Sequence, residues 1–235
     1  MTKKVAICQS NYIPWKGYFD LMNQVDEFLL FDDMQYTKRD WRNRNRIKTP
    51  NEAMWLTIPV KVKGKYYQKI YETVISYPNW NIQHWKTIVT NYSKARFFHE
   101  YKEIFEDLYL GCQEKYLSKI NYRFINAINE LLDIDTKLSW SMEFTIVEGK
   151  TERLVELCKQ LDASTYISGP SAKNYIDNGL FLSEGIELEF LEYANYPAYN
   201  QLFLPFEHNV SIIDLIFNEG DNAKTFLKSF EDKKE

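Results

Sequence analysis

Residues 36–48 gather six cationic side chains, two asparagines and a tryptophan in a chain whose net charge is -4. Arginine guanidinium groups bind two phosphate oxygens at once, and a tryptophan ring stacks on a base or a sugar. This basic segment therefore predicts a site for a phosphorylated ligand, with a solvated basic loop as the alternative. The ligand-binding residues predicted here are Tyr36, Lys38, Arg39, Trp41, Arg42, Asn43, Arg44, Asn45, Arg46 and Lys48.

Two carboxylates, Asp32 and Asp33, directly follow an apolar run at residues 28–31. In open α/β sheets, ligands bind beyond the carboxyl ends of the strands. One of the two carboxylates is therefore expected to act as a general base or to bind a metal-bound phosphate. The alternative is an Asp-rich turn, or ion pairing with Arg39 and Arg42.

A polar loop containing Gln9, Asn11 and Tyr12 leads from a short apolar strand into a helix. Free N–H groups at a helix N-terminus favour an anion, so the loop predicts phosphate binding by Gln9 and Tyr12. Asn11 is expected to take part in catalysis. The alternative is that these polar side chains only satisfy the backbone of a turn.

The later turn at residues 165–175 resembles the first loop in design, because Ser168, Gly169 and Ser171 are small enough for backbone to approach a ligand. Lys173 is expected to reach back toward the strand end, although a short capped helix with an exposed lysine explains the pattern equally well. Asp214 interrupts an apolar helix at residues 211–217. A carboxylate there is costly unless paired, for example with the basic segment, and a solvent-facing position is the alternative.

Several classes of protein are disfavoured by composition. Cys8, Cys112 and Cys158 are scattered, and the three histidines show no ligand spacing, so no metal site is expected. The sequence does not identify a cofactor. The acidic net charge argues against nucleic acid as the general partner, while tRNA stays open through the basic segment. No apolar run approaches the ~20 residues of a membrane span, and the N-terminus has no signal-peptide core, so we expect a cytoplasmic protein without a membrane partner.

The elements that must position these residues alternate between strands and helices. Strands are expected at Lys4–Cys8 and Glu27–Phe31, with a helix from Trp15 to Val25 between them. Such connections between parallel strands are right-handed, which brings Asn11 toward Asp32 and Asp33. Further strands are expected at residues 53–62, where Pro59 favours a sheet edge, at 165–167 and at 186–193.

Helical periodicity dominates the middle of the chain, at residues 97–108 and 117–131, and Gly111 is placed to end the first of these helices. A later helix is expected to begin after Thr151, which would be its N-cap, and another is expected at residues 210–218. The pattern predicts an α/β fold with a mostly parallel sheet flanked by helices and a helical layer or subdomain in mid-chain. We expect one domain over residues 1–230, with a helical insertion near 80–135, and a disordered tail at 231–235.

Five motifs in order, residues 9–20, 32–36, 41–49, 167–173 and 211–215, closely resemble the WbqC-like family. The resemblance implies a bacterial role in surface-polysaccharide or O-antigen synthesis, in which a glycyl-type aminoacyl group is transferred to a sugar. Members typically read His-Gln-Pro where this chain has Cys8, Gln9 and Ser10. A fainter similarity to HIGH-type nucleotidylyltransferases lacks both histidines at residues 15–18, so it implies only a parallel α/β sheet and a nucleotide-binding geometry.

The leading hypothesis is a transferase that adds an acyl or aminoacyl group, from an unknown donor, to the amine of a nucleotide-linked amino sugar. In it the arginines of the basic segment hold phosphates, Trp41 packs on a ring, and Asp32 or Asp33 deprotonates the amine. Two alternatives are a non-catalytic nucleotide or sugar-phosphate binding module of a polysaccharide assembly complex, and an ATP-using nucleotidylyltransferase-like enzyme.

Overall fold

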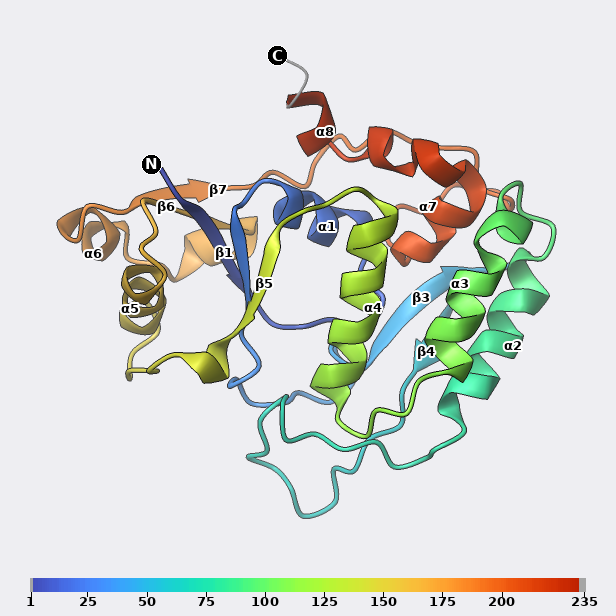
Figure 1. The fold of residues 1–235 in the computed structure, drawn as a ribbon, viewed down its shortest axis with the longest axis horizontal. Coiled ribbons are helices and arrows are strands. Elements are labelled where there is room, and N and C mark those ends of the chain that lie inside the picture. Colours follow the sequence, from blue (N-terminus) through green and yellow to red (C-terminus); the bar gives the residue numbers. More distant parts are fainter. Residues whose placement is uncertain (1, 233–235) are drawn as a thin grey trace.

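The computed structural model describes residues 2–232, and its centre is a five-stranded sheet in which every neighbouring pair is parallel (Figure 1). This confirms the predicted α/β class. The strands, in their order across the sheet, are β5 (Lys137–Trp140), β2 (Glu27–Leu30), β1 (Lys4–Cys8), β6 (Thr165–Ser168) and β7 (Glu187–Phe190). The chain runs outward from β1 to β2 and β5, and then returns to add β6 and β7 on the other side of β1.

Successive side chains of the central strands pack alternately into two separate hydrophobic cores. Ala6 of β1 packs into the larger core, while Val5 and Ile7 pack into the smaller one. Successive strand residues point to opposite faces, so an uninterrupted apolar run is what a sheet covered on both faces requires. The helix α1 (Lys16–Asn23) lies on the larger core, and α5 (Glu152–Gln160) and α6 (Asn178–Ser183) lie on the smaller.

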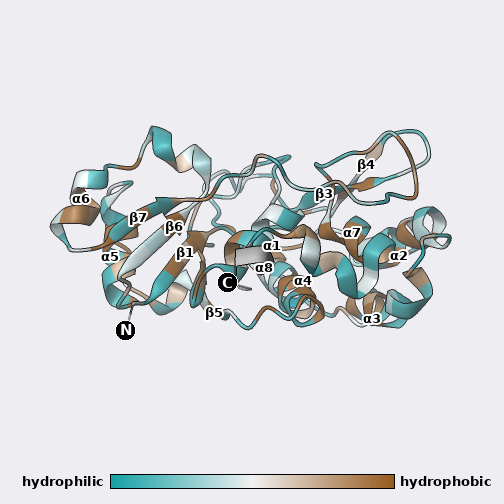
Figure 2. Ribbon diagram, turned by 90° about the horizontal axis from the view of Figure 1, so that it is seen from above, coloured by the Kyte–Doolittle hydropathy of each residue, from teal (hydrophilic) through white to brown (hydrophobic). Residues whose placement is uncertain are grey.

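The helical part predicted for mid-chain is present between β2 and β5. It consists of α2 (Trp80–Tyr92), α3 (Phe98–Leu110) and α4 (Leu117–Leu131), and Gly111 stands at the end of α3. Helix α7 (Ile212–Glu219) packs against α3 and is buried on all sides. Seen from above, these helices occupy one end of the molecule, and α5 and α6 with β6 and β7 occupy the other (Figure 2).

A second, two-stranded sheet was not predicted. Strands β3 (Arg44–Lys48) and β4 (Ala53–Thr57) pair antiparallel as a hairpin, and Ser211 N–H before α7 donates to the carbonyl of Arg46 at 2.8 Å. Asn45 and Ile47 point inward, whereas Arg44 and Arg46 alternate with them on the outer side. Polar residues on both faces hid β3 in the sequence, and the strand expected over residues 53–62 ends at Thr57, before Pro59.

Other boundaries differ from the sequence predictions. Strand β5 was missed, and the strand expected at residues 186–193 is β7 alone. Thr151 is not a side-chain cap for α5, because its hydroxyl instead accepts from the N–H of Asp177 at 3.1 Å. The turn after β6 forms a 3-10 helix (Pro170–Asn174).

The end of the chain continues as a second 3-10 helix (Gly220–Phe226) and α8 (Ser229–Asp232). Of the tail expected to be disordered, residues 231 and 232 belong to α8, and residues 233–235 lie outside the described residues. Within residues 2–232, no helix has the length and apolar character needed to cross a membrane.

Candidate functional site

A cavity of about 660 Å³ opens at the carboxyl ends of β1 and β6. The strand order reverses between these two strands, so their diverging connections leave a crevice where open α/β sheets bind ligands. Cys8 and Gln9 at the end of β1 line the cavity together with Ser168 and Gly169 at the end of β6. Two loops that the sequence marked for ligand binding, the first of them for phosphate, therefore meet in this switch-point cavity.

Three cationic side chains line the switch-point cavity: Arg42, Lys150 and Arg153. Arg42 donates from Nη1 to the side-chain oxygen of Asn11, and its Nη2 lies 3.6 Å from a carboxylate oxygen of Asp40, so the guanidinium is held in place. Arg153 donates from Nε to the carbonyl of Gly149. Lys150 is exposed and forms no hydrogen bond with a described residue. This arrangement suits a ligand with at least two negative charges.

Tyr193 lines the cavity and closely approaches the backbone at Gly169. A Cβ at Gly169 would lie 3.2 Å from the Tyr193 hydroxyl, so a larger residue here would require that side chain to shift. The Tyr166 hydroxyl donates to Ser168 Oγ at 3.2 Å, which orients the serine at the strand end. Ser171 also lines the cavity and is exposed.

A smaller cavity of about 250 Å³ adjoins the first, because Tyr193 lines both and the Arg42–Asn11 hydrogen bond joins their walls. Its other lining residues are Pro14, Trp15, Trp41, Asn45 and Asn209. Tryptophan rings and amide side chains suit a flat or cyclic polar group. The two cavities together form a cleft that can hold phosphates beside Arg42 and a ring beside Trp15 and Trp41.

Acid–base groups are scarce in this cleft. None of its lining residues is Asp, Glu or His in the part of the chain that the structure describes. Burial raises the pKa of the Cys8 thiol, although Arg42 opposes the shift, so the thiol stays protonated near neutral pH. Nor does any group of three or more His, Cys, Asp or Glu side chains within residues 2–232 have an arrangement that could hold a metal ion.

Asp32 lies outside the cleft as a fully buried hydrogen-bond acceptor, which corrects its predicted exposure to a ligand. Its carboxylate accepts from the N–H of Ser10 at 2.8 Å, from Ser10 Oγ at 2.7 Å and from Ser118 Oγ. Burial raises the pKa of this carboxyl, and the bonds from Ser118 and Ser10 oppose the shift. The first loop and the end of β2 do converge, but Asp32 serves there to hold the backbone of the first loop at Ser10.

Asp33 is also absent from the walls of the cleft. Its carboxylate accepts from Lys69 Nζ at 3.0 Å and from Ser141 Oγ at 2.7 Å. These contacts tie the end of β2 to the segment after β4 and to the end of β5. Neither predicted base therefore lines either cavity of the cleft.

Most of the basic segment also lies elsewhere. Asn43 donates to the carbonyl of Ile58 at 2.8 Å, and Lys48 donates to that of Pro205 at 2.6 Å, both from buried positions. Asn45 donates to the carbonyls of residues 12 and 13, which holds the first loop, and its side chain also borders the smaller cavity. Tyr36 is buried, and burial raises its pKa to about 12.

The remaining cations of the segment lie outside the two cavities. Lys38 and Arg39 are exposed, and Arg44 stacks on Trp55 with its guanidinium 4.0 Å from the ring centroid. Arg46 donates to the carbonyl of Asn209 at 3.1 Å. Arg42 is thus the one cation among the segment's described residues that lines the switch-point cavity.

Asp214 and Lys173, also predicted to bind substrate, line neither cavity of the cleft. Asp214 is fully buried, and it accepts from the hydroxyls of Tyr92 at 2.8 Å and Tyr199 at 2.6 Å and from Gln201 at 2.8 Å. Its hydrogen-bond partners are thus not arginine or lysine. Burial raises the pKa of Asp214, and the three hydrogen bonds and the charge of Lys48, from the basic segment, oppose the shift. Lys173 is exposed, with Nζ 5.4 Å from the centroid of the Phe190 ring.

Tyr12, predicted to bind substrate, belongs to a buried cluster. Its hydroxyl bonds to His84 Nδ1 at 2.8 Å and to the Tyr109 hydroxyl at 2.8 Å, while His84 Nε2 lies 3.2 Å from the carbonyl of Thr57. Burial lowers the pKa of His84 to about 4. The cluster joins the first loop to α2 and α3, so Tyr12 has no surface left for a ligand.

This cluster predicts a loss of stability in acid. An exposed histidine in the unfolded chain has a pKa near 6.5, against about 4 in the folded protein, so between these values the unfolded state binds more protons. The contribution of His84 is complete above pH ~6.5 and falls by about 2–3 kcal/mol near pH 4.5. Urea unfolding above pH ~6.5 and near pH 4.5 measures this difference in the free energy of unfolding. His84→Gln should remove most of the difference, because the raised pKa values of Asp32 and Asp214 act with the opposite sign, and the lowered pKa of Glu27 acts with the same sign mainly below pH ~4.5. An unchanged difference would contradict the assignment.

Sequence reasoning missed Lys150, Arg153 and Tyr193 as cleft residues. Lys150 and Arg153 flank the start of α5, which follows the parallel strand β5. A helix after a parallel strand begins near the carboxyl edge of the sheet, so both cations are singled out once β5 is known, and the sequence analysis missed that strand. Tyr193 comes from an irregular segment with no such signal.

Comparison with known proteins shows the family of this chain. A model of the WbqC-like protein family matches residues 9–226. The chain is 50% identical over 226 residues to "Uncharacterized protein Rv1507c" of Mycobacterium tuberculosis (strain ATCC 25618 / H37Rv), covering 96% of this chain and 98% of that one. No solved structure matches the chain.

Proposed function

The chain belongs to the WbqC-like protein family, and from that premise we propose that it binds a nucleotide-linked amino sugar in the cleft at the ends of β1 and β6. The observation that carries the proposal is the junction of a cavity lined by Arg42, Lys150 and Arg153 with one lined by Trp15 and Trp41. The cations suit a diphosphate, and the second cavity suits a sugar or base.

The proposed reaction is the transfer of an acyl or aminoacyl group to the sugar amine, in the synthesis of a bacterial surface polysaccharide such as O-antigen. Support for the reaction comes from the family resemblance, and support for the ligand comes from the cleft. Arg42 would orient the phosphates, and Asn11, which accepts from Arg42, would stand between the phosphate and ring positions. A nucleotide-linked substrate also agrees with the cytoplasmic location expected from the sequence.

A non-catalytic binding module is the second candidate. The observation that favours it is the lack of Asp, Glu and His among the described residues that line the cleft, because deprotonation of an amine ordinarily uses such a side chain. In that case the chain would hold the nucleotide sugar for a partner enzyme.

Two measurements separate these outcomes. Calorimetric titration with UDP and with UDP-linked and dTDP-linked amino sugars should show saturable binding, and its absence for all of these ligands would overturn the proposed function. Mass spectrometry after incubation with the bound sugar, glycine and ATP, or with glycyl-tRNA, should reveal a heavier sugar nucleotide. Binding without any product would support the binding module and exclude transfer from those donors.

A further inference from the structure

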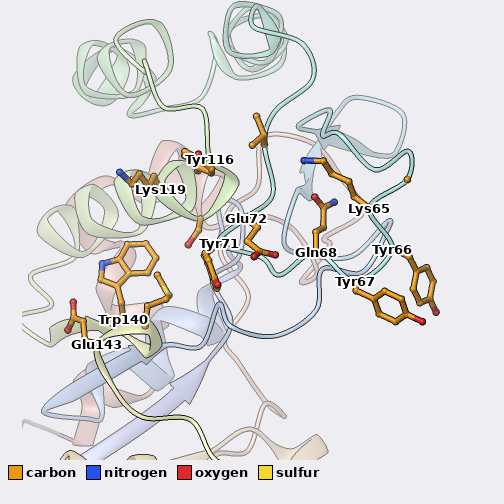
Figure 3. A pocket seen from close by; sticks show the side chains of 14 residues that line it. Lys65, Tyr66, Tyr67, Gln68, Tyr71, Glu72, Tyr116, Lys119, Trp140 and Glu143 are labelled. Atoms are coloured by element: carbon orange, nitrogen blue, oxygen red, sulfur yellow. The ribbon is translucent and has the colours of Figure 1, made fainter.

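A second and larger cavity of about 1040 Å³ lies between the segment at residues 64–74, the start of α4 and the end of β5 (Figure 3). It shares no lining residue with the switch-point cleft. Its size is at the upper end of the range for ligand sites, about 300–1,000 Å³. Five aromatic residues line it: Tyr66, Tyr67, Tyr71, Tyr116 and Trp140.

Two of these rings make contacts that restrict their positions. Trp140 stacks on Tyr122 of α4, with ring centroids 5.2 Å apart and planes at 29°. The backbone N–H of Tyr71 donates to the carbonyl of Asp32 at 3.2 Å, and Lys69 Nζ lies 5.4 Å from the centroid of the Tyr71 ring. Figure 3 shows Trp140 and Glu143 on one side of the cavity, Tyr71 and Glu72 in the middle, and Tyr66 and Tyr67 projecting outward at the far rim. Fixed rings provide flat apolar surfaces at a low entropic cost.

An unpartnered acceptor belongs to the same wall. Gln68 lines the cavity and is only 8% exposed; its Nε2 donates to the carbonyl of Lys61 at 2.9 Å, but its Oε1 accepts no hydrogen bond from a described residue. Buried amide oxygens are rarely left without a donor, because the missing bond costs about 1–3 kcal/mol. A ligand hydroxyl could supply the donor.

The charge of the cavity indicates the kind of ligand. Lys65 and Lys119 are balanced by Glu72 and Glu143, so the wall has no net charge and differs from the cationic switch-point cleft. Balanced charges disfavour a phosphate or a nucleic acid and supply both donors and acceptors. Flat aromatic surfaces, mixed hydrogen-bonding groups and an unpaired acceptor together match a neutral, polyhydroxylated ring.

We propose that this aromatic cavity is a binding site for a neutral oligosaccharide, with Trp140 and Tyr71 packing on sugar rings and Gln68 Oε1 accepting from a sugar hydroxyl. The inference does not depend on the proposed function of the cleft. The two sites contain different residues, so each can fail alone.

The test is titration of the purified chain, without nucleotide sugar, with neutral oligosaccharides of glucose, galactose, mannose, rhamnose and N-acetylglucosamine. At least one should bind saturably, and Trp140→Ala should weaken that binding about tenfold or more. Tyr71→Ala should also weaken it, whereas Tyr71→Phe, which keeps the ring, should have a much smaller effect. Thermal unfolding of each variant shows that it is folded, and Tyr71→Ala serves as the test if Trp140→Ala is not.

Matched controls assign the effect to this cavity. Trp55→Ala removes a partly exposed tryptophan that lies outside it, and oligosaccharide binding should be unchanged. Arg42→Ala should likewise keep oligosaccharide binding, whatever it does to nucleotide-sugar binding. Failure of every oligosaccharide to bind, or unchanged binding in folded Trp140→Ala and Tyr71→Ala, would overturn the inference.

Discussion

Replacing Arg42 with alanine should weaken the binding of a UDP-linked amino sugar about 30- to 150-fold, which corresponds to about 2–3 kcal/mol. The guanidinium lines the switch-point cavity and is already held by Asn11 and Asp40, so little side-chain entropy is lost when a phosphate binds. The affinity of Arg42→Lys should fall between those of the unaltered chain and Arg42→Ala, because an ammonium cannot bind two phosphate oxygens in a planar fork. Calorimetric titration at fixed ionic strength measures all three proteins.

The matched control is Arg39→Ala, which removes the same charge from the same segment. Arg39 is exposed and lines neither cavity, so affinity should change by about twofold or less. Its backbone has φ of 57°, but alanine carries the same Cβ and adds no strain. Equal losses in the two variants would mean that the segment attracts phosphate only through long-range charge, and the cleft would lose its central residue.

The strand and helix pattern of the first 31 residues could be predicted because one physical rule decided it. Val5, Ala6 and Ile7 are apolar in succession, which a strand requires when both faces of the sheet are covered, and the structure buries all three. By contrast, Arg44 and Arg46 alternate with Asn45 and Ile47 in β3, where the outer face is cationic and the inner face is half polar. Without an apolar face of the usual kind, β3 looked like a loop, although a strand was expected over the residues of its partner β4.

The candidate site was predictable in location and less so in its residues. The loops after β1 and β6 do meet, as parallel topology requires, and Gln9, Ser168, Gly169 and Ser171 line one cavity. Charge and residue type alone could not separate Arg42, which faces that cavity, from Arg44, which stacks on Trp55. Such choices depend on the direction of each side chain, and tertiary packing sets that direction.

The same distinction explains Asp32, whose carboxylate follows a buried strand as a catalytic base would but accepts three hydrogen bonds beneath the surface. A base must reach its proton, whereas a fully buried acceptor can only hold its donors. The two donors of Ser10 belong to the first loop, and Ser118 belongs to α4. Asp32 therefore joins the first loop to the helical part, and removal of its carboxylate should lower the free energy of unfolding.

Asp32→Ala should lower the free energy of unfolding by about 3 kcal/mol or more, because it leaves the donors of Ser10 and Ser118 buried without an acceptor. Asp32→Asn should cost less, since the serine hydroxyls can rotate to accept from the amide. Asp33→Ala is the control and should cost less, about 1–2 kcal/mol, because its ion-pair partner Lys69 is partly exposed and only the Ser141 hydroxyl loses a buried acceptor. Urea unfolding near neutral pH measures the three variants. If Asp32→Asn unfolded like the unaltered chain yet abolished turnover of a bound amino sugar, Asp32 would be a catalytic group reached through a conformational change, and its structural assignment would be wrong.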